Sequence, residues 1–129
     1  MQIGYDELTE GYEFPTSTYE LTAQLISRYL EAVDATQTLL PDFVPPMAVA
    51  AYVIPAMLKY LVLPPGAVHA SQELVFCKSV PIGATISCRA KVSRKSTRSK
   101  LRLLAIEMSA FDAGGEQVLK GKATVIFPS

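Results

Sequence analysis

The chain has 129 residues and a mass of 14.0 kDa, which fits a single domain. Half of its residues are hydrophobic and 19% are charged, a balance that excludes an intrinsically disordered chain. The formal net charge is zero, which argues against a nucleic-acid-binding protein, and prolines and Lys59 interrupt the longest apolar stretch, so no membrane span is expected.

The N-terminal part predicts an extended arm followed by a helix. Residues 12–20 are rich in residues that favour extended structure, but Pro15 keeps them out of the centre of a sheet. Thr22 is a suitable helix cap, and the apolar residues that follow recur at the spacing of one helical face. We therefore expect an amphipathic helix over residues 23–34.

Residues 47–62 predict a second helix of a different kind. They are apolar on nearly every side, and Lys59 is the only charged residue among them. A helix that is apolar all round is expected to be buried inside a larger structure. Pro55 should kink it or split it in two, and Pro64-Pro65-Gly66 should end it.

The remainder of the chain predicts a meander of four strands. Residues 84–93 alternate between apolar and polar side chains, which indicates a strand with one buried face. A less regular strand over residues 67–78 precedes it, and strands over 101–111 and 117–127 follow, with turns at 81–83, 94–100 and 112–115. The order predicts an α+β domain in which an antiparallel sheet wraps around the buried helix, with an exposed sheet edge that pairs with a second chain.

Charge is distributed unevenly along the sequence. Eight acidic residues and only one base, Arg28, lie in the part that ends at Asp42, whereas eight bases and no acid lie between Lys78 and Arg102. The basic run is either a solvated hairpin face or a patch that binds the phosphates of a ligand. Under the second interpretation, Arg94, Lys95 and Arg98 are the candidate phosphate-binding residues.

Histidine and cysteine are scarce, which restricts the available chemistry. Cys77 and Cys88 cannot form a disulfide framework, and no secretory signal is recognised, so a cytoplasmic location is expected. His69 is the only histidine, and no metal site is expected. An enzyme with an imidazole base would therefore depend on His69.

Several short motifs occur in an order that resembles a known family. Pro45-Pro46 precedes the apolar helix, a His-x-x-Gln-Glu stretch begins at His69, Pro81-Ile82-Gly83 forms the next turn, and Gly121-Lys122-Ala123 lies in the last strand. Together they resemble the N-terminal-type domain of the MaoC-like dehydratases, over about residues 11–127. The resemblance implies one hotdog domain over residues 1–129, in which an antiparallel sheet wraps around a central helix.

The resemblance implies acyl-thioester chemistry. Members hydrate enoyl thioesters or dehydrate 3-hydroxyacyl thioesters on coenzyme A or acyl carrier protein, and need no cofactor besides that substrate. Their catalytic form has an Asp and, five residues later, a His. One group acts as the base that transfers a proton, and the other orients the reacting water within hydrogen-bond reach. Asp34 stands at the acid position of this sequence, but Leu39 stands where the histidine would be.

Three functions remain open from the sequence. The first is a helper subunit of a MaoC-like hydratase or dehydratase that shapes the acyl tunnel while a catalytic partner supplies Asp and His. The second is a self-sufficient (R)-specific hydratase or dehydratase in which Asp34 and His69 form a shifted dyad, and the third is a binding module without turnover. Met47, Tyr52 and Met57 are expected either in the core or along the acyl tunnel, and the assembly is expected to be a homodimer or a heterodimer, with no nucleic acid and no membrane as partner.

Overall fold

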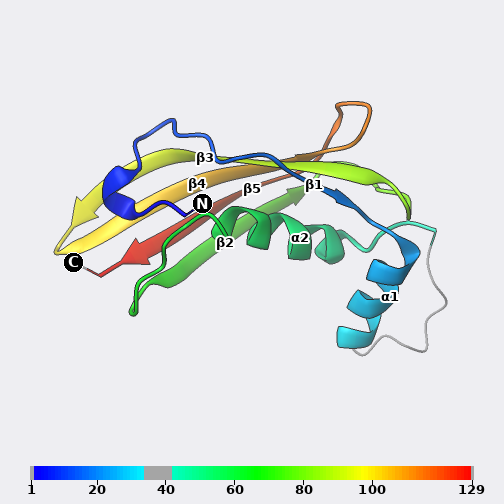
Figure 1. Cartoon of the computed structure of the whole chain (residues 1–129), viewed down its shortest axis with the longest axis horizontal. Coiled ribbons are helices and arrows are strands. Elements are labelled where there is room, and N and C mark those ends of the chain that lie inside the picture. The colour runs from blue at the N-terminus through cyan, green and yellow to red at the C-terminus, as the bar shows by residue number, and fades with distance from the viewer. Residues whose placement is uncertain (1, 34–41, 129) are drawn as a thin grey trace.

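The structure, a computed structural model that describes residues 2–33 and 42–128, contains one five-stranded antiparallel sheet with a helix along one face (Figure 1). The strands run in the order β1-β3-β4-β5-β2, so β1 and β2 form the two edges. This confirms the α+β architecture. The elements are the 3-10 helix η1 (Tyr5–Glu7), β1 (Ser17–Glu20), α1 (Ala23–Ala32), α2 (Pro46–Leu58), β2 (Val68–Phe76), β3 (Thr85–Arg98), β4 (Leu101–Phe111) and β5 (Gln117–Phe127).

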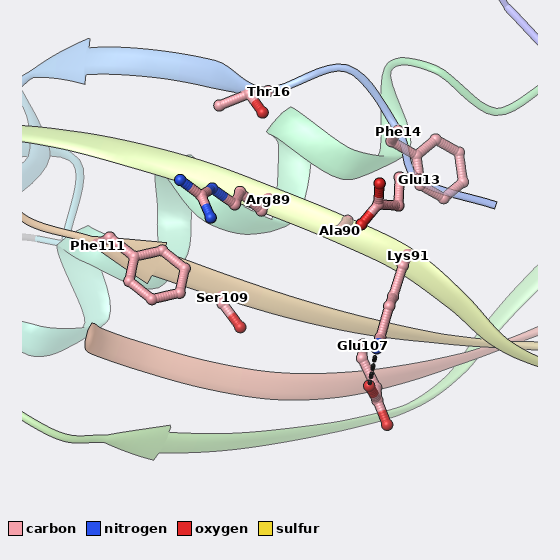
Figure 2. A pocket seen from close by; sticks show the side chains of 9 residues that line it. All are labelled: Glu13, Phe14, Thr16, Arg89, Ala90, Lys91, Glu107, Ser109 and Phe111. Atoms are coloured by element: carbon pink, nitrogen blue, oxygen red, sulfur yellow. Dashed lines mark ion pairs between the residues drawn. The ribbon is translucent and has the colours of Figure 1, made fainter. Parts of the chain in front are cut away.

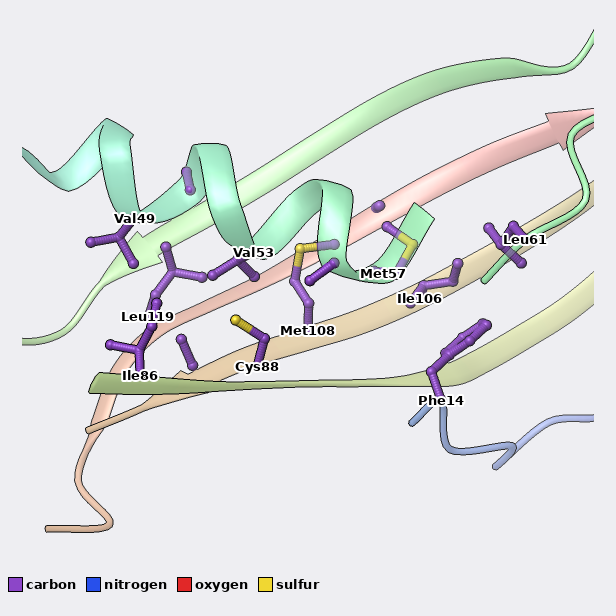
Figure 3. Close-up of a cluster of buried hydrophobic side chains, with 14 of the residues drawn as sticks. Phe14, Val49, Val53, Met57, Leu61, Ile86, Cys88, Ile106, Met108 and Leu119 are labelled. Atoms are coloured by element: carbon purple, nitrogen blue, oxygen red, sulfur yellow. The ribbon is translucent and has the colours of Figure 1, made fainter. Parts of the chain in front are cut away.

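The core lies between α2 and the inner face of the sheet (Figure 3). Alternate residues of each central strand point toward α2, as the period of two requires. Small residues such as Ala48 and Ala56 on the inward side of α2 allow the helix to approach the strands closely. The buried residues that α2 and the three central strands contribute include Val49, Val53, Met57, Ile86, Cys88, Val92, Leu104, Ile106, Met108, Leu119, Val125 and Phe127.

The first helix forms where the sequence predicts it. The Thr22 hydroxyl accepts a hydrogen bond from the backbone N–H of Leu25 at 3.2 Å, which caps α1. Ile26 is its only fully buried residue, and α1 lies off one end of the sheet rather than across it (Figure 1). Pro15 lies just before the short edge strand β1, as expected for a residue that cannot donate to a sheet ladder.

The apolar helix is buried as predicted on the side that faces the sheet, but the single chain does not enclose it. The helix ends at Leu58, four residues before the predicted end, and continues as one element through Pro55. One side packs on the sheet, but Met47 is 55% exposed and Ala51 and Pro55 are also exposed on the outward side. A single sheet layer covers only one side of a helix, so an apolar stripe along α2 is left uncovered.

The predicted turn over residues 94–100 is also wrong, because β3 continues through most of it, as far as Arg98. The turn is only Ser99-Lys100, and both residues take positive φ angles of 47° and 69° without glycine. A bulge between Val92 and Arg94 shifts the alternation of β3 by one residue. The sequence after Val92 therefore loses its simple period of two, although the strand does not end.

The β4–β5 turn is held by Asp112. Its carboxylate accepts hydrogen bonds from the backbone N–H groups of Gly114 and Glu116, at 3.0 and 2.9 Å, and from the Lys78 ammonium at 2.7 Å. The ammonium of Lys78 and the two backbone donors hold the pKa of Asp112 below its usual value. Lys78 follows β2, so this carboxylate links the edge strand to the hairpin.

We expect this link to make the stability of the folded state vary with pH in the acidic range. A carboxyl group whose pKa is lowered by folding stabilises the folded state at pH values above the ordinary aspartate pKa. This stabilisation is lost as the pH falls through the pKa of the group in the folded state. Asp112→Asn should lower the melting temperature near neutral pH, and the difference from the parent chain should shrink between about pH 4 and pH 2. Thermal melts across this range check it, with Glu20→Gln, which removes an exposed carboxylate of β1, as the control. A difference that stays constant with pH would contradict the role given to Asp112.

Candidate functional site

An apolar groove lies at the N-terminal end of α2. It has a volume of about 390 Å³ and collects side chains from the segment before α2, from α2 itself, and from the end of β2. Phe43 and Phe76 are 55% and 41% exposed, which is unusual for aromatic residues outside a binding surface. The lining residues are Phe43, Val44, Pro46, Val49, Phe76, Cys77, Lys78, Ser79, Val80 and Val118.

The interior beneath α2 leaves almost no free space. The hollow bounded by Phe14, Val53, Met57 and Cys88 measures about 10 Å³, which is too small for an alkyl chain. Burial raises the pKa of the Cys88 thiol to about 11, against the opposing effect of the Lys59 charge, so Cys88 is a neutral packing group rather than a nucleophile. Of the hollow and the groove, only the groove is large enough for an acyl chain.

The three predicted tunnel residues do not share one side of α2. Met57 is buried in the core, and Tyr52 stacks at a ring distance of 5.6 Å on Tyr19 of β1. Met47 points outward and is exposed beside the groove. The groove instead uses Phe43 and Phe76, which the sequence interpretation missed, because they lie 33 positions apart and meet only in the fold.

His69 lies on the edge strand β2 and faces the α2 side together with Gln72. Residues three apart on a regular strand point to opposite faces, but a bulge between His69 and Ser71 brings both onto one face. His69 Nε2 lies 3.0 Å from Gln72 Oε1. The Gln72 amide nitrogen is already directed at the backbone oxygens of Glu73 and Lys122, so its oxygen must accept and His69 Nε2 must donate.

The structure does not test the predicted dyad of Asp34 and His69, because it describes only one of the two residues. The partner of His69 among the described residues is an amide, not a carboxylate. Asp34 and Leu39, which the sequence resemblance aligns with the acid and the histidine of the catalytic form, lie outside the residues that the structure describes. The assignment of either Asp34 or His69 to catalysis stays a prediction.

The opposite face of the sheet carries four of the eight bases of the basic run, Arg89, Lys91, Arg94 and Arg98. A hollow of about 470 Å³ lies there, in which Arg89 lies over the ring of Phe111 at 4.8 Å and Lys91 pairs with Glu107 at 3.8 Å. Figure 2 shows the side chains that line it. Arg94 and Arg98 continue along the same face of β3 and line a second hollow. This face is separated from the groove by the sheet itself.

Lys95 is not on that face. Its ammonium donates to the carbonyl oxygen of Leu8 at 2.9 Å and lies 4.5 Å from the ring centre of Tyr5. Arg102 lies 5.0 Å from the same ring and donates to the carbonyl oxygen of Pro128. Lys95 therefore helps to fasten the N-terminal segment, whereas the other two predicted phosphate-binding residues, Arg94 and Arg98, lie together.

Residues 2–33 and 42–128 contain neither a cluster of metal ligands nor a membrane-spanning helix. No group of three histidine, cysteine, aspartate or glutamate side chains that could hold a metal ion occurs there. None of the helices in these ranges is long and apolar enough to cross a membrane.

Comparison with solved structures decides the fold. The R-hydratase PhaJ1 from Pseudomonas aeruginosa in its unliganded form superposes with a TM-score of 0.79 over 99% of this chain and 87% of its own, at 21% identity. A MaoC-like dehydratase from Rhodospirillum rubrum gives 0.76 over 95% and 94%, at 17% identity. The chain has the hotdog fold. The predicted resemblance to MaoC-like dehydratases is confirmed at the level of the fold.

A two-protein assembly is also among the structures with this hotdog fold. The ChsH1–ChsH2 complex from Mycobacterium tuberculosis matches with a TM-score of 0.72 over 92% of this chain and 98% of its own, at 12% identity. Comparisons with models of protein families and with curated proteins found no match. The hotdog fold therefore rests on three-dimensional likeness and on the arrangement of strands around α2.

Proposed function

We propose that this chain is the acyl-thioester-binding helper subunit of a MaoC-like enoyl hydratase or 3-hydroxyacyl dehydratase. The observation that carries the proposal is the match of the whole hotdog domain to an R-hydratase and a MaoC-like dehydratase, combined with a leucine at position 39. A leucine side chain cannot transfer a proton. The substrate is an acyl thioester of coenzyme A or of acyl carrier protein, and no other cofactor is required.

The groove at the start of α2 is the acyl-binding surface in this proposal. Its exposed aromatic rings, Phe43 and Phe76, offer apolar area that an alkyl chain would remove from water. Lys78 lies at the rim but is already paired with Asp112 and Glu116, at 2.7 and 3.3 Å. Because the charge of Lys78 is already paired, we propose that the groove binds the apolar acyl tail of the ligand rather than a phosphate.

The partner is expected to cover the apolar stripe of α2 and the β2 edge. All nine residues of β2 lie at an edge of the sheet, and Val68 and Val75 are half exposed. An edge strand with free backbone donors and acceptors pairs readily with another strand. The ChsH1–ChsH2 complex, in which a chain similar to this one is assembled with another protein, supports association with a partner, and we propose a second copy or a catalytic relative.

We expect Met47→Glu to break this assembly. Met47 lies on the exposed stripe at the second position of α2, where a glutamate favours the helix itself because of the helix dipole. A partner that covers the stripe would bury the carboxylate unpaired, which costs about 3 kcal/mol or more and weakens the dimer at least roughly 100-fold. Light scattering during gel filtration measures the change.

The matched control for this variant is Gln24→Glu. Gln24 is also exposed and also stands at the second position of its helix, α1. This control should keep the parent assembly. If Met47→Glu keeps it as well, the partner does not cover α2.

Mixing experiments test the helper role. Tagged chain purified from its host should bring down a hotdog subunit that has the intact Asp and His segment, and the pair should turn over enoyl-coenzyme A. A chain that is fully active alone would favour the self-sufficient hydratase with Asp34 and His69. A chain that binds acyl thioesters but activates no partner would favour the binding module.

A further inference from the structure

We propose that the outer face of the sheet holds an anion site for a phosphate-bearing ligand, built by Arg94, Arg98 and Lys122. These three side chains line a hollow of about 180 Å³. Two hydroxyl groups, Ser96 and Thr124, complete its polar lining. Leu103 and Ala105 form its apolar floor, and no carboxylate is among the lining residues.

The strand register explains why a hollow exists at this point. Arg94 pairs with Ala105, and Ala105 pairs with Thr124 on the next strand. The small alanine leaves a gap over β4, with a guanidinium on one side and a hydroxyl on the other. The bulge before Arg94 turns both Arg94 and Arg98 onto this face.

The two arginines are the strongest donors of the site. Neither forms an ion pair within residues 2–33 and 42–128, where the ion pairs involve Lys78, Lys91 and Arg102. A guanidinium presents a planar fork of N–H donors that matches two phosphate oxygens. Leu103 and Ala105 keep water from the floor, which strengthens charge-assisted hydrogen bonds above it.

Lys122 is the weaker member because carboxylates stand on both sides of it. Glu107 on β4 and Glu73 on β2 are its partners in register. Glu107 also faces Lys91 at 3.8 Å, so its charge is shared. The site therefore depends chiefly on Arg94 and Arg98, with Lys122 closing it on the β5 side.

The anion site is independent of the acyl groove. The groove lies on the α2 side of the sheet, and it meets β5 at Val118, six residues before Thr124. At about 3.3 Å per residue this is roughly 20 Å along the strand. An anion on the outer face and an acyl tail in the groove should therefore bind at the same time.

Pyrophosphate is the probe that tests the site. Calorimetric titration at low ionic strength should show saturable binding that weakens as salt is added. Arg94→Gln/Arg98→Gln should reduce the affinity at least roughly tenfold, since charge-assisted hydrogen bonds are lost. Arg89→Gln/Lys120→Gln removes the same two charges from exposed residues of the outer face outside the hollow and should leave the affinity within about twofold of the parent.

A second arm distinguishes the source of the phosphate. Adenosine 3′,5′-bisphosphate carries phosphates of the coenzyme A type, whereas pyrophosphate represents a free polyphosphate. If the nucleotide binds more tightly than pyrophosphate and the arginine variant loses this binding, the ligand is coenzyme A. If pyrophosphate binds as tightly or more tightly and the same variant loses this binding, the ligand is a free anion. Absence of binding by both probes, or binding that survives the arginine substitutions in a folded protein, would overturn the proposal.

Discussion

The isolated chain is expected to hydrate crotonyl-coenzyme A at no more than about one hundredth to one ten-thousandth of the rate of the complex with its catalytic partner. General acid–base catalysis contributes roughly this factor, and Leu39 removes the group that would supply it. His69 is not expected to replace it, because the partner of its ring among the described residues is the amide of Gln72, at 3.0 Å. Loss of the enoyl absorbance measures the rate.

His69→Ala separates the helper from a self-sufficient enzyme. In the helper, the substitution should leave the low basal rate unchanged and should alter stability or assembly, because His69 lies on the β2 edge. The parent chain, assayed alone and with its partner, is the control. Robust turnover by the isolated parent that disappears in a folded His69→Ala protein would instead assign the base to His69.

A large loss of stability is expected when Gly121 on β5 is replaced by alanine. A Cβ atom there would lie 2.6 Å from the backbone oxygen of Glu73 and 3.1 Å from a methyl group of Leu74, so β2 would have to move away. Overpacking of this kind costs about 1–3 kcal/mol, and Gly121→Ala should lower the melting temperature by roughly 3–12 °C. Thermal unfolding followed by circular dichroism checks it.

Gly4→Ala is the matched control for this substitution. Its φ angle of −91° suits any residue, and the added Cβ would meet only the flexible end of Glu7 at 3.6 Å. It should be neutral or slightly stabilising, because alanine restricts the unfolded chain. A Gly121→Ala protein as stable as this control would mean that β2 does not pack closely against β5.

Regular patterns made the central part of the fold predictable. The strands expected over residues 101–111 and 117–127 coincide with β4 and β5, and the cap at Thr22 begins α1 as expected. The end of β3 was not predictable, because the bulge after Val92 changes which residues face inward. Positive φ angles at Ser99 and Lys100 also lack the glycine signal on which a turn prediction depends.

The candidate site was less predictable than the fold because it depends on tertiary placement. Arg94, Lys95 and Arg98 are close in sequence, but strand alternation places Lys95 on the other face of the sheet. Lys122 joins the two arginines from β5, a strand that only the folded sheet brings near. His69 and Gln72 share a face only because of a bulge that no local pattern marks. The exposed side of α2 likewise reflects what the single sheet leaves uncovered, not a property of the helix sequence.

Binding of saturated acyl-coenzyme A thioesters of increasing chain length tests the central claim most directly. Calorimetry should show that affinity rises about fourfold for each methylene group that the groove buries, as expected for about 0.8 kcal/mol per group. Phe43→Ala and Phe76→Ala should flatten this dependence, whereas Val68→Ala, at the other end of β2, should preserve it. Affinity that does not change with chain length, or that keeps its full dependence without Phe43 and Phe76, would contradict an acyl-binding role for this groove.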